Sequence, residues 1–145
     1  MATVAKGDTY ANDFLKLIFN ATAISLIADN AATTPLTNLY VSLHTADPGG
    51  AGSQTTNEAT YTSYARVAVA RTSGGWTVTA DSVSPVADIV FPAATGGTNT
   101  ITHWSVGTLT SGAGKQLYRG TVTPNISVSN GVTPKVTTAS TIKED

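Results

Sequence analysis

The 145-residue sequence contains no cysteine. This absence excludes disulfide frameworks, thiolate nucleophiles and cysteine-based zinc sites. Charged residues are scarce as well: they make up 12% of the chain, and the formal net charge is −1. That share is about half of what globular proteins usually carry. A chain without a basic field does not attract polyanions, so we expect no nucleic-acid partner.

Long hydrophobic runs are also missing. The longest apolar stretch, residues 21–28, is interrupted by Thr22 and Ser25 and is far shorter than the ~20 residues that span a bilayer. The first ten residues, MATVAKGDTY, lack the apolar core of a secretory signal. We therefore expect no membrane partner and no export by an N-terminal signal. The 41% of hydrophobic residues is enough for a single domain over residues 1–145 without a metal or disulfide.

The N-terminal part of the chain predicts one helix. Residues 1–8 are small and polar, which is typical of a flexible arm. A helix is expected over residues 9–28, with Asp8 as a candidate N-cap. We expect its apolar face to pack on a sheet, and docking on a neighbouring subunit is the alternative. The helical spacing is carried by Tyr10, Phe14, Leu17, Ile18, Ala21 and Ile24.

From Pro35 onwards the hydrophobic period changes from helical to two. Apolar and polar residues alternate over 39–44 and 61–71. The second segment is expected to form a hairpin with residues 76–80 through the turn Ser73-Gly74-Gly75. Residues 36–145 therefore predict a mainly β fold, a β-sandwich or jelly roll of seven to eight strands after one N-terminal α-helix. The remaining strands are expected at 88–91, 101–106, 116–122, 126–129 and 135–142, with a tight turn at Asn130-Gly131.

The two histidines, His44 and His103, are the natural starting point for a search for chemistry. Asp47 follows His44 at a spacing that could help to bind a metal, but too few further ligands are present to complete a site. The alternative is that His44 hydrogen-bonds the backbone of the following loop and that Asp47-Pro48-Gly49-Gly50 forms a turn. We predict no metal site.

Other catalytic patterns are incomplete. Asp81 and Asp88 flank predicted strands and could be imagined as a glycosidase pair, but the acidic residues are scattered. Residues 112–115, GAGK, are similar to a phosphate loop, yet Leu109 and Gln116 replace the glycine and the hydroxyl residue it requires. A hairpin turn explains them better. No G-x-S-x-G elbow is present. We expect no enzyme, no catalytic residue and no cofactor.

Two features suggest binding instead of catalysis. The aromatic residues Trp76, Trp104, Tyr40, Tyr61, Tyr64 and Tyr118 could line a sugar-binding face, although such residues more often form core or cross-strand pairs. The long loop 46–60 lacks any strand or helix pattern. Loops of this length often serve contacts with a partner, so we expect a contact role for it, with simple solvent exposure as the alternative.

Several segments together resemble a family of small bacteriophage virion structural proteins, often labelled phage tail fibre protein. The resemblance covers residues 13–142 and is carried by DFLKLIFNATA, YVSLHTADPGGAG, YTSYARVAVARTSGGWTV, DIVFPAATGG, THWSVGT and NISVSNGVTP. It implies a viral structural protein located in the virion.

The first reading of this resemblance is a capsid decoration, or cement, protein on the outer capsid surface. Such a protein would bind the phage major capsid protein and form a homo-oligomer, a dimer or a trimer, that stabilises the shell by bridging its subunits. The alternative is a tail fibre or a tail-associated adsorption component. A second alternative is a module displayed on the virion that binds host glycans.

Overall fold

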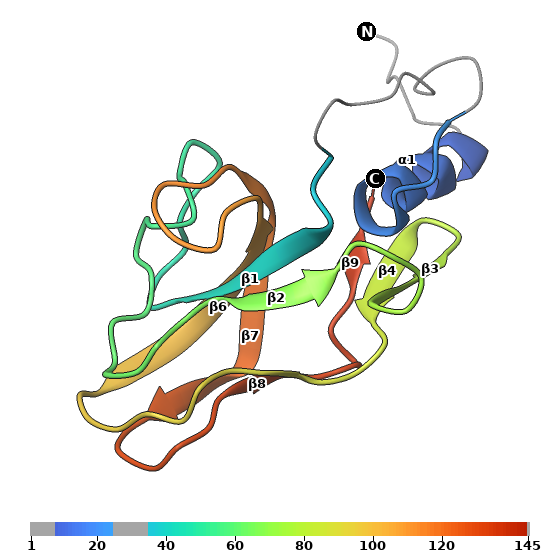
Figure 1. Ribbon diagram of the computed structural model, residues 1–145. Coiled ribbons are helices and arrows are strands. Elements are labelled where there is room, and N and C mark those ends of the chain that lie inside the picture. The colour runs from blue at the N-terminus through green and yellow to red at the C-terminus, as the bar shows by residue number, and fades with distance from the viewer. Residues whose placement is uncertain (1–7, 25–34, 145) are drawn as a thin grey trace, which may run out of the picture. The chain divides into compact units, whose positions relative to one another are not determined.

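The computed structural model describes residues 8–24 and 35–144. Within these ranges the fold is mainly β, as predicted, with one helix, α1 (Asp8–Asn20), and several antiparallel sheets (Figure 1). The predicted arm lies outside the described residues except for Asp8. The strands are β1 (Asn38–His44), β2 (Val67–Ala70), β3 (Trp76–Thr79), β4 (Ser82–Pro85), β5 (Ile89–Val90), β6 (Asn99–Gly107), β7 (Gln116–Val128), β8 (Lys135–Val136) and β9 (Ile142–Lys143).

The contacts within the chain define two compact units. The first unit combines the segments 1–37, 70–87 and 138–145, and the second combines 38–69 and 88–137. Each unit is built from segments that are far apart in the sequence, so long-range pairing holds each unit together. The prediction of a single domain over 1–145 stays a prediction. The helix of the described residues is too short to cross a membrane.

The helix ends earlier than predicted. It begins at Asp8 and stops at Asn20, because Ala21 adopts a left-handed backbone conformation (φ 52°). The main-chain N–H of Thr22 then donates to the carbonyl of Lys16 at 3.1 Å and closes the helix end. The extension through residue 24 was therefore wrong: the apolar spacing continues past a residue whose backbone has already left the helix. Residues 25–28 of the predicted helix lie outside the described part of the chain.

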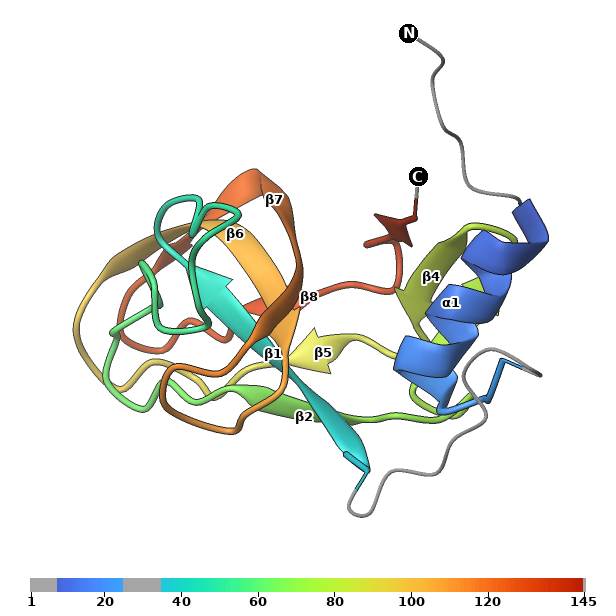
Figure 2. The same cartoon turned by 90° about the horizontal axis from the view of Figure 1, so that it is seen from above.

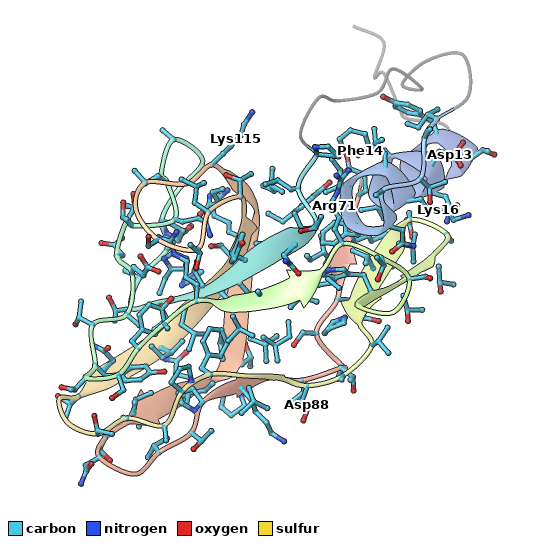
Figure 3. All side chains as sticks on the ribbon, in the orientation of Figure 1. Asp13, Phe14, Lys16, Arg71, Asp88 and Lys115 are labelled. Carbon is cyan, nitrogen blue, oxygen red and sulfur yellow. The ribbon has the colours of Figure 1, made fainter. Side chains whose placement is uncertain are left out.

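Arg71 caps the C-terminus of α1 from a distant part of the sequence (Figure 3). Its Nε donates to the carbonyl of Ile18 at 2.6 Å, and its Nη2 donates to that of Leu17 at 2.5 Å. The last carbonyls of a helix have no partner within the helix and carry partial negative charge. The last turn of α1 has no basic residue of its own. Arg71 therefore supplies both the donors and the cation that this helix end lacks.

The core of the first unit lies between α1 and a three-stranded sheet in the order β3-β4-β9. The helix contacts β3 and β4. Leu15, Phe19 and Trp76 are completely buried, and the rings of Phe19 and Trp76 meet edge to face with centroids 4.8 Å apart. The aromatic pair thus joins the helix to the sheet at the centre of this unit.

The predicted hairpin between residues 61–71 and 76–80 was wrong. β2 covers only Val67–Ala70 and lies in the sheet of the second unit, whereas β3 pairs with β4. The turn between β3 and β4 places Ala80 at a positive φ of 52°. Alanine gives no turn signal in a sequence, so β4 was missed, and the glycine turn at 73–75 was assigned to a pairing that it does not make.

The second unit contains a four-stranded sheet in the order β2-β1-β6-β7 and a two-stranded pair, β5-β8 (Figure 2). β1 and β6 are antiparallel, with Val41 opposite Val106. The two strands expected at 116–122 and 126–129 are one long strand, β7, which shifts register against β6 around residues 122–125. The single strand expected at 135–142 is divided into β8 and β9, which belong to different units.

The sheet of the second unit buries an apolar face. Leu39, Val41 and Leu43 of β1 alternate with polar residues and are at most 2% exposed. Trp104 lies opposite Leu43 on β6 and is 5% exposed. The predicted alternation in β1 is confirmed.

Replacing Arg71 with alanine should destabilise the protein by about 1–3 kcal/mol, because the carbonyls at the end of α1 lose their charged donors. Arg71→Lys should recover only part of this loss, since an ammonium cannot reproduce the planar fork of donors. Urea unfolding of the two variants measures the effect, with Lys16→Ala as the matched control on the helix. Equal stability of Arg71→Ala and the original protein would contradict the capping role.

Candidate functional site

The second face of the sheet is polar and nevertheless buried. Ser42 and His44 on β1 and Ser105 on β6 have no exposed surface. A polar sheet face usually lies in water, but here the loop 45–66 and the β6–β7 hairpin loop 108–115 are bonded to it. We call these two segments the paired loops. The 112–115 segment is the hairpin turn that the sequence predicted.

Gln54 connects the paired loops to the sheet. Its Nε2 donates to the Oγ of Ser42 at 3.1 Å, and its Oε1 accepts the main-chain N–H of Leu109 at 2.9 Å. Its own N–H donates to the carbonyl of Gly114 at 3.0 Å. A Cβ at Gly107 or at Gly114 would lie 2.1 Å from the Gln54 side chain. These two glycines therefore make the space in which the buried amide sits.

Both ring nitrogens of His44 have hydrogen-bond partners within the protein. Nδ1 lies 2.9 Å from the carbonyl of Thr56, and Nε2 lies 2.7 Å from the Oγ of Ser105. Since a carbonyl can only accept, Nδ1 carries the proton and Nε2 accepts the serine hydroxyl. Burial lowers the pKa of His44, which favours this neutral form. The predicted bond from His44 to the backbone of the following loop is confirmed.

A serine bonded to a histidine is also the arrangement of an activated nucleophile. Ser105 and His44 are both 0% exposed, so no substrate can reach the serine oxygen in this structure. The pair instead holds residue 56 of the loop against the sheet. The residues that the structure describes contain no group of three or more side chains placed to hold a metal ion.

Asp47 forms the predicted turn and also ties the loop to β7. Its Oδ1 accepts the N–H of Gly49 at 2.8 Å and the Nε of Arg119 at 2.8 Å. The Gly49 N–H first and then the Arg119 guanidinium lower the pKa of Asp47. His44 and Asp47, which have the spacing of metal ligands in the sequence, therefore each make a separate structural contact.

Arg66 is the strongest link between the paired loops. Its side chain is 2% exposed and makes a two-pronged ion pair with Glu58, Nε to Oε1 at 2.7 Å and Nη2 to Oε2 at 2.8 Å. The same guanidinium donates to the carbonyls of Leu109 at 2.9 Å and Gly112 at 2.7 Å. One buried cation thus satisfies a carboxylate in the first loop and two carbonyls in the second.

Tyr64 extends this network to β1. Its hydroxyl donates to Oε1 of Glu58 at 2.9 Å and accepts the N–H of Leu43 at 3.1 Å. Burial raises the pKa of Tyr64, so the phenol stays protonated. The outer edge of β1 is therefore closed by the loop.

The other candidate residues do not gather into a site. Asp81 and Asp88 belong to different units, and each forms an ion pair with a lysine of its own unit. The Nζ of Lys143 lies 3.4 Å from Oδ2 of Asp81, and the Nζ of Lys135 lies 2.8 Å from Oδ2 of Asp88. Among the aromatic residues, Trp76, Trp104 and Tyr61 are buried, which confirms the core reading for these three. Nothing in the sequence pointed to Gln54, Glu58 and Arg66, because isolated polar residues in a loop do not signal that they are buried. Ser105 was missed because a serine on a strand is usually exposed.

The accessible surface above this network is made of short polar residues and few charges. The large apolar side chain exposed in the hairpin loop is Leu109, at 47% exposure. The contact role predicted for residues 46–60 stays a prediction. Hydrogen bonds join several of these residues to the sheet and to the hairpin loop.

A family model described as "Podophage GP4 fiber I protein gp80" matches residues 7–143. The match covers nearly the whole chain, and the protein belongs to this family. No curated protein matches the chain. The family membership defines a phage virion structural protein, in agreement with the resemblance found in the sequence.

Replacing Arg66 with methionine should destabilise the protein by about 3–5 kcal/mol, because the Glu58 carboxylate would lose its cation and keep only the Tyr64 hydroxyl as a donor, and the carbonyls of Leu109 and Gly112 would each lose a donor. We expect faster amide hydrogen exchange in residues 45–57 and 108–115 than in β1. Lys115→Met is the control, since it removes a charge from the exposed surface of the same hairpin. Unchanged exchange in both loops would show that Arg66 does not hold them together.

His44 should make stability depend on pH. Its pKa in the folded protein lies below the ordinary value of 6.5, so the unfolded chain binds the proton first as the pH falls. The contribution of His44 to the free energy of unfolding is complete above pH 6.5. It is lost as the pH falls from 6.5 to the lowered pKa of His44 in the folded protein. The free energy of unfolding at about pH 7.5 and about pH 5.5 measures this loss. His44→Gln should reduce the difference and His103→Gln should keep it; the reverse pattern would refute the assignment.

Proposed function

We propose that the protein is a structural subunit of a fibre on the phage virion. The observation that supports this most directly is the family match over residues 7–143, because the family is described as a podophage fibre protein. We further propose that the protein works by contact with other virion proteins and catalyses no reaction.

The architecture suits a part that must keep its shape outside a cell. The paired loops are held by buried hydrogen bonds and one buried ion pair, without any cysteine. A surface fixed in advance loses little conformational entropy when a partner binds. The low charge adds little repulsion between neighbouring subunits. Both properties favour repeated contacts in an assembly.

The second candidate is the capsid decoration role, with the phage major capsid protein as partner. It is favoured by the composition of these residues, which show neither the repeats nor the coiled-coil heptads typical of long fibres. The glycan-binding alternative has less support, because Trp76, Trp104 and Tyr61 are committed to the interior.

Immunogold electron microscopy of purified phage particles tests the proposal. We expect a specific antibody against this chain to label discrete fibres, with a phage carrying a deletion of the coding sequence as the unlabelled control. Uniform labelling of the capsid shell would contradict the fibre role and support the capsid decoration role instead. Purified particles without any label, together with no chain detected by mass spectrometry, would contradict both.

A further inference from the structure

The turn after β7 contains the one asparagine of the chain that is followed directly by glycine, Asn130. Val132 donates its main-chain N–H to the carbonyl of Ser129 at 3.0 Å and closes the turn. Gly131 has a φ of 87°, a conformation that residues with a side chain rarely adopt. The tight turn predicted from Asn130-Gly131 is therefore confirmed, and its backbone conformation requires the glycine.

This turn is bonded to the segment that precedes β6. The N–H of Gly131 donates to the carbonyl of Ala94 at 2.7 Å, and the N–H of Ala94 donates to the carbonyl of Val132 at 2.9 Å. Ala94 is 2% exposed, so the turn is attached to the interior of the second unit. The main-chain nitrogen of Gly131 is thus held by a short hydrogen bond to a buried residue.

The side chain of Asn130, in contrast, is exposed. Other asparagines of the second unit use their carboxamides in the fold: Nδ2 of Asn57 donates to the carbonyl of Asp47 at 3.1 Å, and Oδ1 of Asn99 accepts two main-chain N–H groups at 2.8 Å. Within residues 8–24 and 35–144, no hydrogen bond holds the carboxamide of Asn130. This carboxamide is free to turn towards the nitrogen of the next residue, which has no side chain in the way.

We propose that Asn130 is a modification site, which loses its amide through a cyclic imide, and that the bond from Gly131 to Ala94 controls the rate. Hydroxide removes the proton from the Gly131 nitrogen, and this nitrogen attacks Cγ of Asn130. The bond from Cγ to Nδ2 then breaks, and Nδ2 takes a proton from water and leaves as ammonia. Water opens the imide by breaking one of its two bonds to the Gly131 nitrogen. Breaking the bond to Cγ gives aspartate, and breaking the bond to the main-chain carbonyl carbon gives isoaspartate.

The first of these steps requires an open turn. The proton that has to leave the Gly131 nitrogen is the one donated to the Ala94 carbonyl, so hydroxide reaches it only after this bond has broken. Three main-chain hydrogen bonds hold the turn closed. The deamidation rate of the folded protein is therefore the rate of the unfolded chain multiplied by the fraction of molecules in which the turn is open.

Either product changes the surface around the turn. The segments 92–102 and 120–134 contain no charged side chain, so the new carboxylate is the first charge in them. Isoaspartate also adds a carbon atom to the main chain between Ser129 and Val132, which alters the spacing on which the turn-closing hydrogen bond depends. The modification concerns the chain itself and does not depend on whether the protein lies on a fibre or on the capsid.

Mass spectrometry of the full chain in mildly alkaline buffer, with and without enough urea to unfold it, tests the site. We expect deamidation at Asn130 in the unfolded chain and an at least about tenfold slower reaction in the folded chain, since three hydrogen bonds oppose opening. Asn130→Gln is the control and should remove the reaction, because glutamine would have to close a larger ring. No deamidation at Asn130 in the unfolded chain, or equal rates in both conditions, would overturn the proposal.

Hydrogen exchange of the Gly131 amide, measured by NMR on the original protein, tests the control by the Ala94 bond. Exchange and deamidation both need the released N–H, so folding should slow both by the same factor. Val132→Pro removes the donor that closes the turn and should accelerate both, whereas Thr133→Ala, at an exposed neighbouring position, should change neither. Circular dichroism verifies that both variants are folded.

A Gly131 amide that is protected much more strongly than deamidation is slowed would show that the reaction proceeds in the closed turn, and would overturn the control by Ala94. The fibre proposal is tested on the particle and would stand in either case.

Discussion

The need to satisfy buried polar groups organises the second unit. A sheet with serines and a histidine on one face would normally leave that face in water, yet Ser42, His44 and Ser105 are fully buried. Their burial is possible because the loop 45–66 supplies partners for Ser42 and His44, and His44 in turn is the partner of Ser105. The loops in turn have no strand or helix of their own and depend on the sheet and on the Arg66 guanidinium. Sheet and loops therefore stabilise each other, and neither is explained without the other.

The first unit uses the same kind of contact on a smaller scale. Its helix ends at Asn20 without a basic residue in its last turn, and Arg71 supplies the donors from beyond β2. In both units an arginine binds carbonyls that lie far away in the sequence. In a chain with 12% charged residues, two of the few cations are thus committed to the fold. This arrangement leaves an outer surface in which short polar side chains predominate.

Local patterns predicted the elements whose side chains alternate clearly. The strand β1 was found because its buried apolar residues recur at every second position, and the hairpin at 112–115 was found from its glycines. The errors arose where the backbone adopts a conformation that the residue type does not indicate. Ala21 and Ala80 adopt positive φ values without glycine, so the helix was drawn too long and β4 was missed. The buried network was invisible for a different reason: the partners of Gln54 and Arg66 are set by the topology, and no spacing along the chain encodes them.

These considerations connect the fold to a structural role in the virion. Rigidity in small proteins outside cells is often achieved with disulfides or metals, and this chain contains no cysteine. Hydrogen bonds in a buried network fix the loop geometry instead, and they do not depend on the redox conditions that a particle meets. The cost is that such a network tolerates few substitutions, because each buried donor lost leaves an acceptor unsatisfied. A protein that needs one fixed surface and no moving parts is consistent with that cost, and a subunit repeated in a virion has this requirement.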